Sequence, residues 1–100
     1  MNDPVKIVDG YYDRLSIRKA VQASTDIETF LGEALTNSDY GIMIKSDGNL
    51  HYSVDGTAAD ADNAMLPTVW SVHGKKYIKD VRLFSTASQY VSIVLYTKTG

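Results

Sequence analysis

The stretch from Gly41 to Val54, GIMIKSDGNLHYSV, carries the strongest local pattern of the sequence. Apolar residues alternate along Gly41–Ser46 and again along Leu50–Val54, and Asp47-Gly48-Asn49 separates the two runs. A period of two places successive side chains on opposite faces of a strand, and an Asp-Gly pair readily takes the positive backbone angles of a tight turn. The stretch therefore predicts a β-hairpin.

The C-terminal part of the chain predicts a second pair of strands. The runs Lys76–Ser85 and Gln89–Thr97 both alternate, and a short link of small polar residues, Thr86–Ser88, joins them. Large apolar side chains occupy both faces of each run. We therefore expect these strands to be buried on both faces, at the centre of a sandwich.

Three further strands are expected in other parts of the chain. Val5–Val8 suits an edge strand, Leu15–Val21 an earlier strand, and Val69–Val72 a strand before a turn at His73-Gly74. Six or seven short strands at close spacing favour antiparallel pairing, because parallel strands need helical crossovers. The predicted fold class is mainly β: an antiparallel β-sandwich, jelly-roll-like or Ig-like, with one short helix.

The helix is predicted over Asp26–Leu35. Apolar residues recur there at helical spacing, namely Ile27, Phe30, Leu31, Ala34 and Leu35. Thr25 and Glu28 have the spacing of a capping box, and Asn37 could end the helix. The alternative is an irregular strand, because Gly32 within the segment costs a helix about 1 kcal/mol relative to alanine.

Length and composition predict one globular domain over residues 1–100, in which residues 1–12 could form an N-terminal arm. The chain has 100 residues, of which 44% are hydrophobic and 22% charged, as in ordinary folded domains. Cysteine is absent, which excludes disulfides, cysteine-based zinc sites and thiol nucleophiles. Stability must therefore come from packing.

Charge and hydropathy argue against two classes of partner, nucleic acids and membranes. The net charge is −2, and Lys and Arg cluster only in pairs, Arg18-Lys19 and Lys75-Lys76. A phosphate-binding surface usually shows a larger basic cluster, so we expect no nucleic-acid partner. The sequence shows neither a secretory signal nor an apolar run of membrane-spanning length, so we expect a protein made in the cytoplasm, with no membrane partner.

The candidates for catalysis are weak. His51 lies in a predicted strand beside Ser53, and His73 lies in a turn, so a structural or solvated role is favoured for both. No nucleophile-elbow motif is present, and the glycines never form a phosphate cradle. We therefore expect neither an active site nor a cofactor, although proximity in the fold could still pair a histidine with a carboxylate.

The Ala/Asp-rich segment Asp55–Pro67 is predicted to be a surface loop. Asp55, Asp60, Asp62 and Asn63 supply the kind of oxygen atoms that bind calcium. Their spacing fails the EF-hand pattern, so a solvated acidic loop is favoured over an ion site. We expect these four residues to form one contact region with a partner protein.

Seven tyrosines are the most unusual feature of the composition. Tyrosine offers a large amphipathic contact area and is enriched at protein interfaces. Tyr11 and Tyr12 lie outside the strongest strand patterns, so we expect them to form a second contact region. The alternative is that most tyrosines pack at the margins of the sandwich.

The second half of the sequence resembles small β-sandwich virion proteins of tailed bacteriophages. The segments that carry the resemblance are Leu50–Ala58, with its Asp-Gly-Thr loop, Met65–Pro67, Val69-Trp70, Tyr77–Lys79, Val81–Leu83 and Val91–Tyr96. The predicted helix at Asp26–Leu35 is not part of that pattern.

The resemblance implies a virion component without an active site. The expected function is a capsid decoration or cement protein that binds the major capsid protein, or another virion protein, and forms a homo-oligomer, with a trimer favoured. The alternatives are a neck or tail accessory protein and a carbohydrate-binding module that uses Trp70 and exposed tyrosines.

Overall fold

The computed structural model describes residues 6–8, 11–66 and 69–98, with side chains from Tyr12 onward. Its elements are, in chain order, β1 (Lys6–Val8), β2 (Tyr11–Val21), β3 (Thr25–Asp26), α1 (Ile27–Leu31), β4 (Asp39–Ser46), β5 (His51–Ser53), β6 (Val69–His73), α2 (Lys75–Asp80), β7 (Arg82–Phe84) and β8 (Gln89–Lys98). The predicted mainly β, antiparallel class is confirmed, with two short helices where one was expected.

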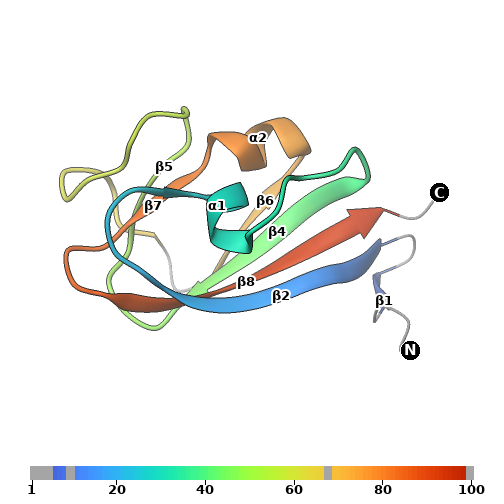
Figure 1. The fold of residues 1–100 in the computed structure, drawn as a ribbon, viewed down its shortest axis with the longest axis horizontal. Helices are drawn as coiled ribbons and strands as arrows, with labels where there is room; N and C mark the ends of the chain where they lie inside the picture. The colour runs from blue at the N-terminus through green and yellow to red at the C-terminus, as the bar shows by residue number, and fades with distance from the viewer. Residues whose placement is uncertain (1–5, 9–10, 67–68, 99–100) are drawn as a thin grey trace.

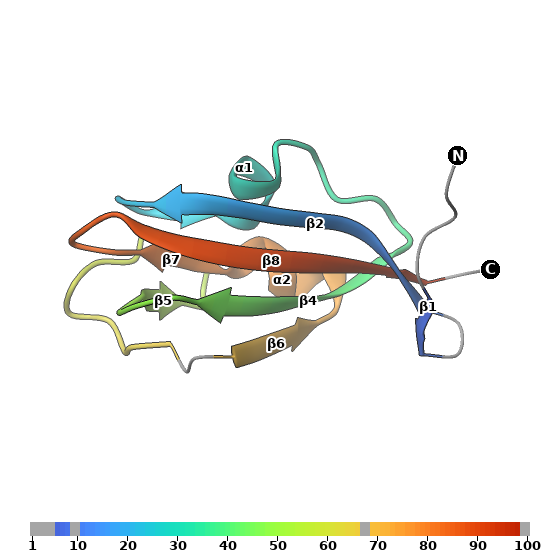
Figure 2. The same ribbon diagram turned by 90° about the horizontal axis from the view of Figure 1, so that it is seen from below.

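The strands form two antiparallel sheets. The larger has the strand order β1-β2-β8-β4-β6, and the smaller has the order β3-β7-β5. Both helices and the small sheet lie on one side of the large sheet, and no described element covers its opposite side (Figures 1 and 2). We call these two sides the inner face and the outer face.

The strand β8 is the centre of the large sheet, paired with β2 along one edge and β4 along the other. Its residues Val91, Ile93 and Leu95 are fully buried on the inner face. The intervening residues Ser92, Val94 and Tyr96 are only half-buried. The prediction that this strand is buried on both faces is therefore wrong for the outer face.

The predicted hairpin between Gly41–Ser46 and Leu50–Val54 is also wrong. The strand β4 pairs with β8 and β6, whereas β5 pairs with β7 in the small sheet. The connection between them crosses from one layer to the other, and there the Ser46 hydroxyl donates to the Gly48 carbonyl at 2.6 Å. Leu50 is fully buried at the end of the crossing. Burial of Leu50 between the layers replaces the pairing that the Asp-Gly turn favours.

The second predicted strand pair is wrong for a similar reason. Lys75–Asp80 form the helix α2, and only Arg82–Phe84 of the expected first strand are extended, as β7. The strand β7 belongs to the small sheet and β8 to the large one. Ile78 and Val81, three residues apart, are both fully buried, which fits the period of a helix.

The predicted helix within Asp26–Leu35 is present but short, ending at Leu31. The capping box is wrong: Asp26 precedes the helix without a side-chain bond, and the Glu28 carboxylate instead accepts the Leu35 N–H at 2.8 Å. Gly32 ends the helix at a φ of +81°, a conformation that costs glycine little. The glycine therefore ends the helix where Asn37 was expected to do so.

The remaining strand predictions agree with the structure. The strands β1, β2 and β6 lie where Val5–Val8, Leu15–Val21 and Val69–Val72 predict them, except that Val5 lies outside the described residues. The strand β2 begins earlier than expected, at Tyr11. Of the predicted arm, residues 6–8, 11 and 12 thus belong to the large sheet, and the other residues of 1–12 lie outside the described part.

One buried carboxylate links the loop after α1 to the sheet. The Asp39 side chain is fully buried and accepts two hydrogen bonds of 2.9 Å from Arg14. It also accepts the Thr36 N–H at 2.6 Å and the Thr97 hydroxyl at 3.1 Å. Burial alone raises the pKa of Asp39, but the bonds from these three residues together outweigh it and hold that pKa below its usual value.

We expect Asp39→Asn to lower the free energy of unfolding by about 1–3 kcal/mol, because it removes the charge that Arg14 pairs with in a buried site. The lowered pKa means that the wild-type contribution is complete above the unfolded value and is lost as the pH falls through the folded one. Urea unfolding from neutral pH to below about pH 4 should therefore show the wild type converging on the variant.

The matched control is Asp47→Asn. Asp47 pairs with Arg18 at a position where both side chains are about half exposed. An exposed ion pair of this kind contributes little, so this variant should lose at most about 0.5 kcal/mol. Equal losses in the two variants would contradict the role given to Asp39.

Candidate functional site

The acidic loop follows β5 and uses its polar side chains to form its own turns. Asp55 accepts hydrogen bonds from the N–H and the hydroxyl of Thr57, and these bonds lower its pKa. Asp60 accepts the N–H of Asp62 at 2.8 Å, and the Asn63 side chain accepts the N–H of Asp60 at 2.8 Å. One carboxylate oxygen of Asp55, one of Asp60 and the side-chain oxygen of Asn63 are therefore engaged within the loop.

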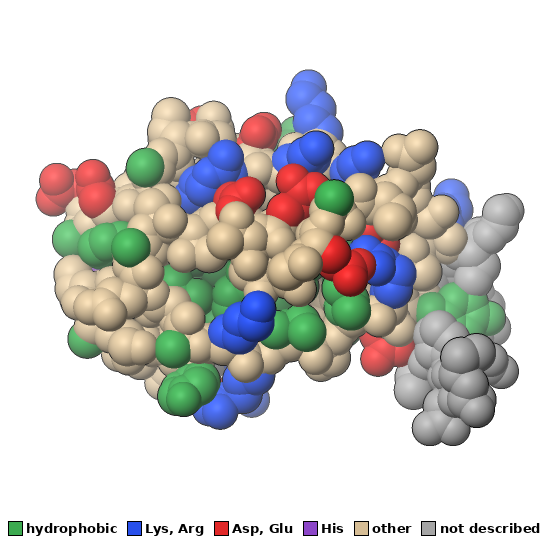
Figure 3. All heavy atoms as spheres, in the orientation of Figure 1, with side chains coloured by type: hydrophobic (Ala, Val, Ile, Leu, Met, Phe, Trp, Pro, Cys, Tyr) green, Lys and Arg blue, Asp and Glu red, His purple; other side chains and the backbone are tan. Residues whose placement is uncertain are grey.

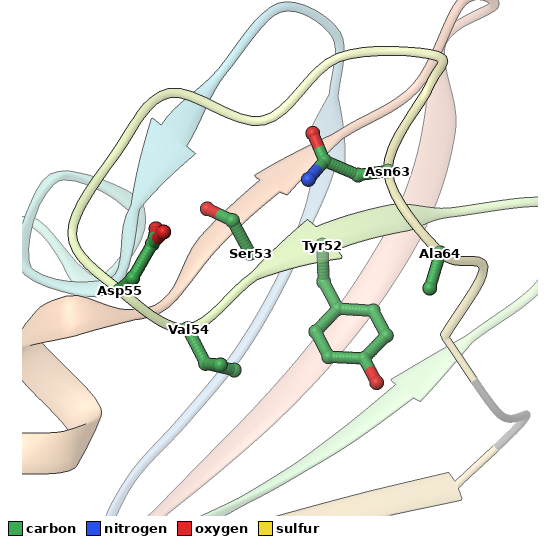
Figure 4. A pocket seen from close by; sticks show the side chains of 6 residues that line it. All are labelled: Tyr52, Ser53, Val54, Asp55, Asn63 and Ala64. Carbon is green, nitrogen blue, oxygen red and sulfur yellow. The ribbon is translucent and has the colours of Figure 1, made fainter.

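Two of the predicted loop residues line a shallow hollow (Figure 4). The hollow has a volume of about 280 Å³ and is lined by Tyr52, Ser53, Val54, Asp55, Asn63 and Ala64. Two of its polar side chains are engaged within the chain: the Ser53 hydroxyl donates to the Thr57 carbonyl at 2.6 Å, and Asp55 accepts from Thr57. Asp60 and Asp62 do not line this hollow.

The predicted tyrosine region does not join the loop. Tyr12 is half-buried in β2 opposite Thr97. In Figure 1 the start of β2 lies at the far end of the molecule from the loop after β5. The two predicted contact regions are therefore separate. The side chain of Tyr11 lies outside the described side chains.

Both histidine rings contact neighbouring residues of the fold. The Nδ1 atom of His51 lies 2.8 Å from the Asn63 carbonyl, and its ring packs near that of Phe84. The His73 ring lies 5.7 Å from that of Tyr40. Within the described part of the chain, no group of three or more His, Asp or Glu side chains could hold a metal ion.

The outer face of the large sheet is the broadest surface that sequence reasoning missed. Cross-strand pairing aligns one row of Ser16, Val94, Met43 and Ser71, and a second row of Arg18, Ser92, Lys45 and Val69. Met43 and Val69 are exposed, at 38% and 52%. Met43 and Val94 thus lie on neighbouring interior strands of this face and Val69 on its edge strand, with serines and basic residues around them.

Aromatic rings border this outer face. Tyr90 is 52% exposed, and the Arg18 guanidinium lies 4.5 Å from the centre of its ring. At the other end, the rings of Tyr96 and His73 flank Gly41, where a Cβ atom would lie 3.0 Å from the His73 ring. Tyr, Met and Arg are the residue types enriched in protein interfaces. The outer face therefore has the composition of a protein-binding surface.

A second apolar surface lies at the edge of the same sheet. A groove of about 450 Å³, here called the β6 groove, is lined by Val54, Trp70, Ser71, Val72, His73, Tyr77 and Val81. Trp70 is half-buried with its ring 4.8 Å from that of Tyr52, and Tyr77 is 62% exposed. The groove thus has an aromatic wall at the boundary between the two sheets.

On the face of the molecule shown in Figure 3, acidic and basic side chains are interspersed. Among the described residues, no helix is long and apolar enough to cross a membrane. Comparison with protein-family models, curated proteins and solved structures finds no match to this chain.

We expect millimolar calcium chloride to leave the melting temperature of the protein unchanged, because loop N–H groups and the Thr57 hydroxyl already occupy oxygens of Asp55 and Asp60. An ion that bound the folded state would raise the melting temperature by mass action. Thermal unfolding with calcium and with a chelator measures this. A rise with calcium that Asp60→Asn removes would contradict the expectation.

Proposed function

We propose that this chain is a structural protein of a tailed-phage virion, a non-enzymatic capsid decoration protein that binds the coat-protein lattice through the outer face of its large sheet. The observation that carries the proposal is the composition of that face. Met43 and Val94 lie at its middle, and the Arg18-Tyr90 pair lies at its border. Such a face suits a protein partner better than a small substrate, which needs a concave site.

The backbone of this face also favours binding. The face is built on β2 and β8, strands of 11 and 10 residues, and contains no long loop. Binding through a preformed sheet orders few additional residues, so little conformational entropy is lost. The surface is ready to dock without a rearrangement.

The size of the face fits repeated weak contacts. The molecule extends 40 × 24 × 22 Å, so one broad side has a projected area of about 1,000 Å², near the 800 Å² per partner of a standard interface. The outer face of a single copy would therefore make one ordinary interface. A lattice that holds many copies suits this arrangement, because avidity adds to modest single affinities.

A carbohydrate-binding or tail accessory protein is the second candidate. It is favoured by one observation, the presence of Trp70 and the exposed Tyr77 in the same groove. Aromatic rings in a groove can stack on sugar rings. A glycan array that finds a ligand for the wild type and none for Tyr77→Ala would favour this candidate.

We expect the protein to sediment with isolated phage capsids and Met43→Asp to abolish that sedimentation, because the substitution places a charge at the middle of the outer face. Met43 is partly exposed, so the variant should keep the wild-type melting temperature within a few degrees. Pelleting through a sucrose cushion measures binding.

The matched control is Met65→Asp, the same substitution at a methionine that is 52% exposed beside β5. This variant should pellet with capsids as the wild type does. Failure of the wild type to pellet would overturn the decoration proposal. Binding by Met43→Asp would instead overturn the assignment of the outer face.

A further inference from the structure

The strand β6 lies at the edge of the large sheet, and no described residue pairs with the side of β6 that faces away from β4. Its only partner among the described strands is β4, in a register without a bulge from Gly41–His73 to Lys45–Val69. Exposed edges of this kind pair with other chains unless something protects them, such as lysine, proline or a bulge. None of these interrupts Val69–His73.

The edge strand β5 of the small sheet, by contrast, is protected. The segment Ala64–Leu66 lies along β5, where the Tyr52 N–H donates to the Ala64 carbonyl at 3.1 Å and the Leu66 N–H donates to the Leu50 carbonyl at 2.7 Å. The edge strand β1 pairs with β2 in an irregular register. The unprotected edge of β6 is therefore a specific feature that calls for a partner strand.

The hydrogen bonds of β6 define which of its groups face outward. The Gly74 N–H donates to the Tyr40 carbonyl, which makes Tyr40–Gly74 a hydrogen-bonded pair. Such pairs alternate along an antiparallel ladder, so Val72 and Trp70 bond to β4. The N–H and C=O groups of Val69, Ser71 and His73 therefore point away from the sheet.

We propose that β6 pairs with β6 of a second copy of this chain, antiparallel and centred on Ser71. This register uses the outward groups of Val69, Ser71 and His73 in both copies, for about six hydrogen bonds. It is self-complementary, as a two-fold interface requires, since Val69 of each copy lies opposite His73 of the other.

The β6 groove fits the same partner. On its inner side the pairing places Trp70 of each copy opposite Val72 of the other, an aromatic–β-branched pair of the kind that stabilises sheets. The second copy thereby fills the groove beside the exposed Tyr77 and Val54 of the first. Apolar surface that water contacts in one copy is then buried between two.

This inference concerns the backbone edge of β6, not the side chains of the outer face, and holds whether or not the protein binds capsids. Light scattering of the purified chain should give twice its mass of 11.0 kDa. Ser71→Pro removes an outward N–H that β4 does not use, so this variant should fold and be monomeric. Ser71→Ala keeps that N–H and should remain a dimer.

A cross-linking variant tests the register directly. The chain contains no cysteine. Opposed Ser71 residues would have Cα atoms about 5.5 Å apart, a separation that a disulfide can span. Ser71→Cys should therefore give a disulfide-linked dimer on mild oxidation, whereas Ser16→Cys, an exposed serine on β2 of the same face, should not.

Three outcomes would overturn the proposal. These are a wild-type mass of one or three chains at high micromolar concentration, a dimer that persists in folded Ser71→Pro, and cross-linking of Ser16→Cys as efficient as that of Ser71→Cys. Should Ser71→Pro fail to fold, the cysteine pair and the wild-type mass still decide the question.

Discussion

The packing of β8 against β4 on the inner face is the constraint on which the rest of the structure depends. Ile93 lies beside Ile44 and Leu95 beside Ile42, and all four side chains are fully buried. Burial of one such side chain contributes about 1.5–3 kcal/mol, so this row is a large part of the stability of a small domain. The row must be covered to be buried. The helices and the small sheet provide that cover, which leaves the outer face to water.

Sequence patterns predicted the strands well and their partners poorly. The alternation in β2, β4, β6 and β8 is a local property, and it was sufficient to locate them. Partner choice is not local: the Asp-Gly turn after β4 is compatible with a hairpin, yet the chain gains more by crossing to the other layer, where Leu50 and Leu83 are fully buried. A similar ambiguity affected α2, because the run containing Tyr77, Ile78 and Val81 fits a strand or a helix until one knows that Tyr77 is exposed.

The candidate surfaces were harder to predict than the fold. The outer face combines every second residue of β2, β8, β4 and β6, so its existence depends on the strand order and not on any contiguous motif. Sequence reasoning assigned contact roles to Asp55, Asp60, Asp62 and Asn63 because they cluster along the chain. In the structure several of these polar groups hold the turns of their own loop. The available signal was the alternation itself, which places Met43 opposite to Ile42 and Ile44 and so marks it as exposed.

The outer face and the β6 edge are geometrically coupled. Residues opposite each other in an antiparallel pair share a face of the sheet, so a two-fold axis at Ser71 runs perpendicular to the strands and the sheet. Two copies joined at β6 would form one continuous sheet of ten strands with both outer faces on the same side. A flat partner could then contact both copies at once. The second contact becomes intramolecular, and its effective concentration raises the total affinity without any new residue in the interface. The pairing of an exposed edge would in this way double the surface that the protein offers to such a partner.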